Sequence, residues 1–532
     1  MKRKIIATLL AASMLIGTLV GCGNSGSANS SFDSSVSTEE TQDAESSTES
    51  TDTASAGGDV DLSEEVNLIL YLYGSEGVAN KDILAALNEK LKEKINTTLE
   101  VKYIDWGDIA TKYPLLWSAG EDFDMAYGGM STVMPYNTLA KQDALMDITD
   151  MLEQYAPTLK EKITQEAWDS TLVNGRIYGV PSTYSEFSKA YGFVTRTDKM
   201  QEYGIESISS IEDMEAYMDA SVAAGRIPLN GTSSLGTETY KMFTMTTNQW
   251  LEIPAISDFY LVGDLNDPEN IISPIFTDEF EDFAARMKTW ADKGYWPTDV
   301  LAATTDDKDN FLNGLADAYI SHQPDWTGQY GTMQTKLPGV DTEFFCFPET
   351  TGTIIATSGS ANMTLINANS KYPERVLMMI ELLMTNKECY DLFQYGIEGR
   401  EYEIKDGKIV TPDSYNKETD EGGFCAWAFR TDELAIPYAS EDERRYTLNE
   451  EWKEVAVQNP YIGFSFDDSE VSAEMSAIAN VNSQLGMQIM LGKTAQDPKD
   501  AVTEYRKQLE AAGINEVIEA VKTQYQEFLA SK

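Results

Sequence analysis

The chain has 532 residues, which corresponds to about three domains or two large ones. It carries 87 acidic and 40 basic residues, so its formal net charge is −47 at pH 7, and 42% of its residues are hydrophobic. The hydrophobic content allows a buried core, whereas the negative charge disfavours binding to nucleic acids and anionic membrane surfaces. The single histidine, His322, excludes most histidine-based metal sites.

The first 22 residues have the pattern of an export signal. Three basic residues (2–4) precede a hydrophobic run from Ile5 to Leu19, and small residues lead to Cys22. This pattern predicts a secretory signal peptide over residues 1–22, because a membrane-spanning helix needs about 20 apolar residues. Leu19-Val20-Gly21-Cys22 resembles the bacterial lipobox, so Cys22 is the expected lipid-attachment residue, acylated for example with palmitate. Plain secretion is the alternative.

Residues 23–65 contain 11 acidic residues and no basic one, with few large hydrophobic side chains. Such a segment cannot bury enough surface to fold, so it is predicted to be a disordered acidic tether. Three further cysteines, Cys346, Cys389 and Cys425, are widely spaced. Their spacing matches no zinc motif and favours buried thiols, with at most one disulfide.

The first part of the folded region alternates strands and helices. Hydrophobic periodicity predicts strands at 66–73, 98–104 and 123–127, with helices at 81–95 and 107–118 between them. This order predicts an α/β fold with a parallel, doubly wound sheet. Ligands of such sheets bind beyond the carboxyl ends of the strands, which places Glu76 and Trp106 at a candidate site.

Further elements follow along the chain, but strand signals are sparse after Ile404, and residues 408–460 show no clear division into elements. The patterns predict strands at 175–181, 191–196 and 314–321, an extended segment at 354–366, helices at 280–293 and 373–385, and one or two helices in the last 35 residues.

Several motifs resemble the family-one extracellular solute-binding proteins of bacterial ABC importers. Asn174-Gly-Arg-Ile-Tyr-Gly-Val-Pro181 is typical of that family. Its Gram-positive LipO/LplA-like lipoprotein branch, associated with saccharide uptake, is suggested by further motifs. These are 103–108 (YIDWGD), 118–124 (SAGEDFD), 195–198 (TRTD), 395–402 (YGIEGREY) and the tail from Ala511. Many family members have Tyr-Asn where this chain has Thr195-Arg196, so site residues cannot be transferred from maltose-type relatives.

The resemblance implies a type II-like fold of two lobes with a hinge and a ligand cleft between them. Chain crossings are expected near 181–191, 353–362 and 398–403. Lobe 1 would comprise 66–190 with 362–398, and lobe 2 would comprise 191–355 with 399–532. The implied protein is a monomeric, lipid-anchored receptor on the extracellular face of the cell membrane. It would bind a neutral oligosaccharide without cofactor or metal, and deliver it to ABC permease subunits.

Saccharide sites combine aromatic faces with a few fixed polar groups. Trp326 is the leading candidate platform, because it follows the strand ending at Ser321 after a turn through Gln323–Asp325. The structural alternative is core packing for the tryptophans, helix capping or solvation for Glu76 and Asp325, and locking of the hinge for Glu398. The complete set of candidates is Trp326, Tyr184, Glu186, Glu76, Asp325, Trp106, Trp250, Trp427 and Glu398.

Two other functions are compatible with the sequence. The same architecture could bind peptides or amino acids. A surface glycoside hydrolase would need two carboxylates at a set separation, and nothing in the sequence marks such a pair. Residues 306–310 (DDKDN) could suggest calcium, but they lack the EF-hand spacing and are predicted to be a solvated acidic loop.

Overall fold

The computed structural model describes residues 60–531, except 130–133, 189, 255, 258 and 465. The predicted signal peptide, Cys22 and most of the predicted tether lie outside the described residues. The two largest hydrophobic cores of the described chain are each built around their own sheet. We call the residues around these cores the first and second lobes, and the mixed α/β, two-lobed fold is as predicted.

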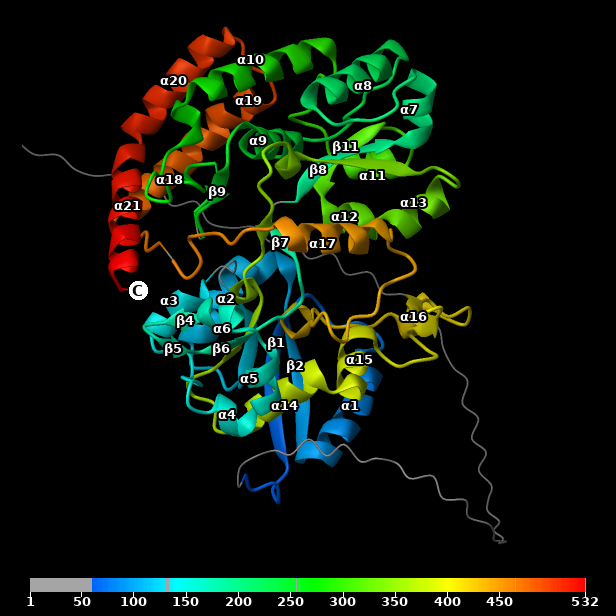
Figure 1. Cartoon of the computed structure of the whole chain (residues 1–532), viewed down its shortest axis with the longest axis vertical. Coiled ribbons are helices and arrows are strands. Elements are labelled where there is room, and N and C mark those ends of the chain that lie inside the picture. Colours follow the sequence, from blue (N-terminus) through cyan, green and yellow to red (C-terminus); the bar gives the residue numbers. More distant parts are fainter. Residues whose placement is uncertain are drawn as a thin grey trace, which may run out of the picture. The chain divides into compact units, whose positions relative to one another are not determined.

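A five-stranded sheet in the order β2-β1-β3-β14-β6 organises the first lobe (Figure 1). β1 is parallel to β2 and β3, as predicted, but β14 is antiparallel to both of its neighbours, so the sheet is mixed. Helices α1, α14 and α15 pack together beside this sheet. The elements are β1 (Val66–Tyr73), α1 (Asn80–Ile95), β2 (Thr97–Ile104), η1 (Trp106–Asp108), α2 (Ile109–Ser118), β3 (Met125–Gly128), α3 (Tyr136–Lys141), α4 (Leu152–Tyr155), α5 (Pro157–Lys162), α6 (Gln165–Asp169), β4 (Leu172–Val173), β5 (Arg176–Ile177), β6 (Gly179–Pro181), β14 (Met363–Ile366), α14 (Pro373–Thr385), α15 (Lys387–Tyr395) and η5 (Trp427–Phe429).

The second lobe contains a three-stranded antiparallel sheet in the order β11-β8-β12, with long helices outside it. Among these, α10 packs against α19 and α20 from the end of the chain (Figure 1). The elements are β8 (Tyr191–Arg196), α7 (Thr197–Tyr203), α8 (Ile211–Ala223), α9 (Ser234–Thr247), β9 (Trp250–Glu252), β10 (Val262–Asp264), η2 (Pro274–Phe276), α10 (Asp278–Lys293), α11 (Asp307–Leu312), β11 (Ala318–His322), α12 (Gln323–Gly328), α13 (Tyr330–Lys336), β12 (Thr342–Cys346), η3 (Phe347–Thr350), α18 (Ser472–Val481), η6 (Asn482–Gly486), α19 (Met487–Met490), α20 (Pro498–Ala511) and α21 (Ile514–Ser531).

Three segments connect the lobes and are hydrogen-bonded to one another. β7 (Phe187–Ser188) pairs with β13 (Ile355–Ala356), and the extended prediction for 354–366 is interrupted by η4 (Gly359–Ala361). Thr183 and Ile355 form parallel bridges to Thr431 and Val457 of the third connection. The remaining elements are β15 (Glu403–Lys405), β16 (Lys408–Val410), α16 (Lys417–Asp420) and α17 (Arg444–Val455).

The third connection begins later than the sequence suggested. Ala426, Ala428 and Phe429 are buried in the core of the first lobe, although 399–532 was assigned to the second lobe. The crossing expected at 398–403 is therefore wrong, because the chain stays with the first lobe through η5. The remaining lobe boundaries stay predictions.

The end of the predicted tether packs against the first lobe. The buried guanidinium of Arg375 donates hydrogen bonds to the backbone carbonyls of Asp61 and Ile95, the latter at 2.6 Å. Asn96 Nδ2 donates to the carbonyl of Leu62 at 2.8 Å. Residues 60–65 are therefore part of the fold, because backbone polar groups there satisfy buried donors.

The three cysteines of the described region are unpaired thiols. Cys346 and Cys389 are buried and Cys425 is half-buried. Burial raises the pKa of the Cys389 and Cys425 thiols to about 11, so both are neutral and unreactive at pH 7.

Candidate ligand-binding cleft

Four aromatic side chains meet at the carboxyl ends of the parallel strands. Tyr73 ends β1, Trp106 follows β2, Tyr127 lies in β3, and Trp427 comes from η5. We call these residues the aromatic cluster. The rings of Trp106 and Trp427 lie 5.7 Å apart, and Tyr127 contacts Trp427 edge-on at 6.1 Å. The doubly wound topology brings these strand ends together, so the cluster occupies the position where such folds bind ligands.

The cluster has a buried base and an exposed surface. Tyr73 and Tyr127 are buried, whereas Trp106 is 54% exposed and Trp427 is 41% exposed. Large exposed aromatic side chains are uncommon in a chain with a well-packed core, and a group of them marks an interaction site. Flat indole faces suit the apolar C–H faces of sugar rings.

A chain of polar contacts continues from the aromatic cluster into the segments that connect the lobes. The hydroxyl of Tyr127 donates to Asn362 Oδ1 at 2.6 Å, and Asn362 Nδ2 lies 3.5 Å from Glu186 Oε2. Burial raises the pKa of Tyr127, so its hydroxyl remains a donor at all ordinary pH values. Arg430 pairs with Glu186 at 2.7 Å and stacks on the ring of Tyr184, with its guanidinium 4.7 Å from the ring centre.

One group in the aromatic cluster and one in the polar chain have unused hydrogen-bonding capacity. The hydroxyl of Tyr73 and Nε of Arg430 are buried and have no partner among the described residues. Buried polar groups are normally satisfied, so groups left open at a site suggest that a ligand completes them.

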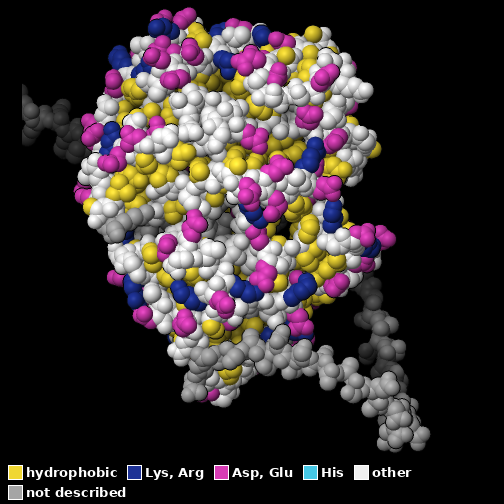
Figure 2. All heavy atoms as spheres, in the orientation of Figure 1, with side chains coloured by type: hydrophobic (Ala, Val, Ile, Leu, Met, Phe, Trp, Pro, Cys, Tyr) yellow, Lys and Arg dark blue, Asp and Glu magenta, His cyan; other side chains and the backbone are white. Residues whose placement is uncertain are grey.

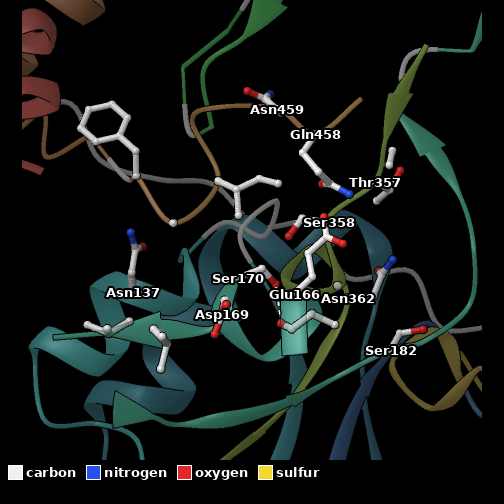
Figure 3. Close-up of a pocket in the computed structure, with 18 of the residues that line it drawn as sticks. Asn137, Glu166, Asp169, Ser170, Ser182, Thr357, Ser358, Asn362, Gln458 and Asn459 are labelled. Atoms are coloured by element: carbon white, nitrogen blue, oxygen red, sulfur yellow. Dashed lines mark hydrogen bonds between the residues drawn. The ribbon is translucent and has the colours of Figure 1, made fainter. Parts of the chain in front are cut away.

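A cavity of about 1970 Å³ adjoins this polar chain (Figure 3). The first lobe supplies Asn137, Glu166, Asp169 and Ser170 to its wall, and the connecting segments supply Ser182–Phe187 and Thr357–Gly359 together with Asn362. Residues Gln458–Pro460 and parts of α21 form the opposite wall. The volume is about twice the upper end of the usual range for small-molecule sites, roughly 300–1,000 Å³, so a ligand of several rings can enter.

The described cavity lining is predominantly acidic, with nine carboxylates against three lysines. Acidic side chains are also spread over the face of the molecule in Figure 2. An acidic wall repels anionic ligands and leaves uncharged ligands unaffected. The lining carboxylates are Glu166, Asp169, Glu186, Asp432, Glu433, Asp467, Glu470, Glu519 and Glu527, and the lysines are Lys141, Lys162 and Lys453.

Two of the predicted site residues line the cavity, and two more belong to the aromatic cluster, which does not line it. Trp106 and Trp427 belong to the aromatic cluster, and Tyr184 and Glu186 line the cavity. Glu76 is exposed on the loop after β1. A Cβ atom at Gly74 would lie 3.6 Å from Trp106 Nε1, so the loop that carries Glu76 passes beside the aromatic cluster. Their contact with ligand stays a prediction.

Trp326, the leading sequence candidate, is placed in the core of the second lobe. It is only 4% exposed, stacks on Phe344 at 4.7 Å, and donates from Nε1 to Thr342 Oγ1 at 2.9 Å. The expected turn is instead the first turn of α12, which His322 caps by accepting the backbone N–H of Asp325. Helix formation turns the indole inward, so the structure does not support Trp326 as a ligand platform.

Three further candidates belong neither to the cavity lining nor to the aromatic cluster. The carboxylate of Asp325 accepts hydrogen bonds from Ser321 Oγ at 2.7 Å and from Lys308 Nζ at 3.0 Å. Both of its partners belong to the second lobe. Trp250 is half-buried against Phe243, and Glu398 is exposed in a turn bridged to Tyr402. None of these three lines the cavity.

The structure adds residues that sequence reasoning missed. Tyr73, Tyr127, Asn362 and Arg430 complete the site. The positions of Tyr73 and Tyr127 at strand ends were a usable signal, because the strands themselves were predicted. Asn362 and Arg430 carried no such signal, since their role depends on contacts far apart in sequence.

The acidic run at 306–310 is not the solvated loop that was predicted. Asp306 caps α11 by accepting the N–H of Asp309 at 2.7 Å, and Asp307 is buried beneath β11. No group of three or more potential metal ligands occurs in the described part of the chain. Burial raises the pKa of Asp307 to about 7.

This shift predicts a pH-dependent stability. Folding takes up a proton at Asp307 between about pH 4 and pH 7, so the stabilising effect of protonation is lost as pH rises through this range. We expect Asp307→Asn to raise the free energy of unfolding by about 4 kcal/mol at pH 8 but by only about 1.5 kcal/mol at pH 5, because the unfolded-state carboxyl group is already ionised at pH 5. Urea denaturation at both pH values measures this, with the exposed neighbour variant Asp309→Asn as control. An equal effect at both pH values would contradict the assignment.

Together, the two-lobed α/β fold and the cleft between the lobes define a binding protein. Residues 85–396 match the family of bacterial extracellular solute-binding proteins, and this is more than half of the chain. The chain therefore belongs to that family. Residues 460–530 match a domain of unknown function. No helix in the described ranges is long and apolar enough to cross a membrane.

A protein relative and three solved structures are similar to most of this chain. A carbohydrate ABC transporter substrate-binding protein of Streptococcus pneumoniae serotype 4 (strain ATCC BAA-334 / TIGR4) is 25% identical over 498 residues, covering 90% of this chain and 94% of the relative. The crystal structure of the N-glycan transport solute-binding protein NgtS from Streptococcus pneumoniae has a TM-score of 0.72 at 21% identity, covering 88% of this chain and 99% of that one. Its complex with Man5GlcNAc has a TM-score of 0.59 at 22% identity, with the same coverage. A Bifidobacterium longum infantis solute-binding protein, described as binding HMO, has a TM-score of 0.62 at 14% identity, covering 87% of this chain and 99% of that one. The structural likenesses confirm the fold, the family rests on the match over residues 85–396, and the narrower LipO/LplA-like branch stays a prediction.

Proposed function

We propose that this protein is an extracellular receptor that captures a neutral oligosaccharide and delivers it to the membrane subunits of an ABC importer. The observation that carries the proposal is the exposed tryptophan pair, joined through Tyr127 and Asn362 to a polar cavity between the lobes. Aromatic faces combined with a few fixed polar groups are suited to sugar rings. The relative described as carbohydrate-binding and the NgtS complexes support the same ligand class.

Binding would act through hinge closure. Glu186 and Arg430 lie on the first and third connecting segments, so a ligand that contacts them also contacts the hinge. A ligand favours the closed arrangement of the lobes only to the extent that it binds the closed arrangement more tightly than the open one. No bond is broken in this cycle, and we assign the protein binding without catalysis. Acylation at Cys22 would hold the monomeric receptor at the membrane surface.

The first expected result is a thermal shift with a neutral glycan. At a concentration of about 100 times its Kd, Man5GlcNAc should stabilise the purified protein by about 2.7 kcal/mol, since ligand binding to the native state favours folding. Differential scanning fluorimetry measures the rise in Tm, with short peptides as the comparison. A shift with peptides but not with glycans would favour a peptide receptor of the same fold.

A further inference from the structure

The C-terminal region has no assigned role, yet it forms part of the cavity wall. Thr523, Gln524, Glu527 and Phe528, all on α21, line the cavity. Gln524 fixes the adjacent loop to this helix, because its amide accepts from the backbone N–H of Asp467 and donates to the carbonyl of the same residue, each at 2.8 Å. The wall is therefore held in place by specific contacts and is not a chance approach of the chain end.

Phe528 presents an aromatic surface at this wall. Its ring packs at 5.7 Å from Phe464 and 6.0 Å from Tyr525, and the side chain remains half-buried. A ring supported by neighbouring rings loses little conformational entropy when it stacks on a ligand. Phe528 thus has the same capability as the tryptophans of the aromatic cluster.

The first lobe supplies a polar group to the same cavity. Asn137 on α3 is only 3% exposed, and its Oδ1 has no hydrogen-bond partner among the described residues. In Figure 3, Asn137 lies at the opposite end of the cavity from Asn362 and Ser182. An acceptor left open in a buried position costs free energy unless a ligand donor completes it.

We propose that α21 and α3 form a distal subsite, in which Phe528 and Asn137 bind the far end of a long or branched neutral oligosaccharide. The inference rests on the proposed function and gives the C-terminal region a role in selecting ligand length. The cavity volume of about 1970 Å³ provides room for sugar rings beyond those that the aromatic cluster can contact. A glycan of only two rings would occupy the aromatic cluster and leave the distal subsite empty.

Isothermal titration calorimetry with Man1GlcNAc and Man5GlcNAc tests this proposal. Wild-type protein should bind both glycans, and Phe528→Ala should weaken Man5GlcNAc about tenfold through loss of the stacking surface. The same variant should bind Man1GlcNAc as the wild type does. Asn137→Ala should give the same selective loss, and far-UV circular dichroism confirms folding. Leu529→Ala is the matched control, since Leu529 is exposed on the same helix and does not line the cavity.

The outcomes separate the two proposals. Equal losses for both glycans in Phe528→Ala, or no loss for either, would overturn the distal subsite and leave the proposed function standing. Binding of Man1GlcNAc but not Man5GlcNAc by the wild type would also overturn the distal subsite. Binding of neither glycan by the wild type would overturn both proposals together.

Discussion

Trp427→Ala is expected to weaken oligosaccharide binding about 100-fold, because truncating a central aromatic anchor commonly costs 2 kcal/mol or more of binding free energy. Trp427 connects the two parts of the site, since its ring contacts both Trp106 and Tyr127, and Tyr127 in turn bonds to Asn362. Its removal therefore takes away a sugar platform and loosens the chain of contacts toward the hinge. Calorimetric titration with Man5GlcNAc measures the loss.

Two further variants test the reason for this loss. Trp427→Phe retains an aromatic face and should recover most of the affinity. Trp250→Phe should bind as the wild type does, because Trp250 is half-buried against Phe243 in the second lobe and belongs neither to the aromatic cluster nor to the cavity lining. An affinity of Trp427→Ala within threefold of the wild-type value would show that the ligand does not use the aromatic cluster.

The sequence predicted local structure well in the first lobe. The alternating run at 66–73 and the helical spacing at 81–95 matched β1 and α1 closely, because burial on one face determines both patterns. It did not predict the antiparallel β14, since strand direction depends on the path of a chain more than 200 residues further on. Periodicity records which face of an element is buried and carries no information about which distant element covers that face.

The site residues show the same difference between what local sequence patterns predict and what they do not. Trp106 could be placed because it follows a predicted strand, and Tyr184 and Glu186 because they lie in the predicted crossing near 181–191. Trp326 was misjudged because α12 begins directly after β11, and one helical turn moves the indole from a loop surface into the core. Whether an aromatic residue faces solvent or core depends on the start of a short helix, and a boundary shift of two or three residues reverses that outcome.

Asp317→Ala is expected to lower the free energy of unfolding by about 3–5 kcal/mol, the usual cost of removing one partner of a buried ion pair. The carboxylate of Asp317 is fully buried, and it pairs with Arg226 Nε at 2.6 Å. It also accepts from Ser221 Oγ at 2.6 Å and Tyr203 Oη at 2.7 Å, so alanine would leave three donors without their acceptor. Urea denaturation at pH 7 measures the change, and the exposed Asp282→Ala on α10 serves as control.

Asp317→Ala should lose stability but keep its affinity, whereas Trp427→Ala should lose affinity but keep its stability. This contrast tests whether folding and binding depend on different residues. Asp317 anchors β11 within the second lobe and does not line the cavity, so well below the unfolding transition its variant should bind Man5GlcNAc with wild-type affinity. Trp427 is exposed, so its variant should lose affinity with less than about 1 kcal/mol of stability. A large affinity loss in Asp317→Ala at low temperature would mean that the interior of the second lobe sets the geometry of the cleft. In that case, the aromatic cluster and its polar neighbours would not account for binding by themselves, because the interior of the second lobe would also determine the affinity.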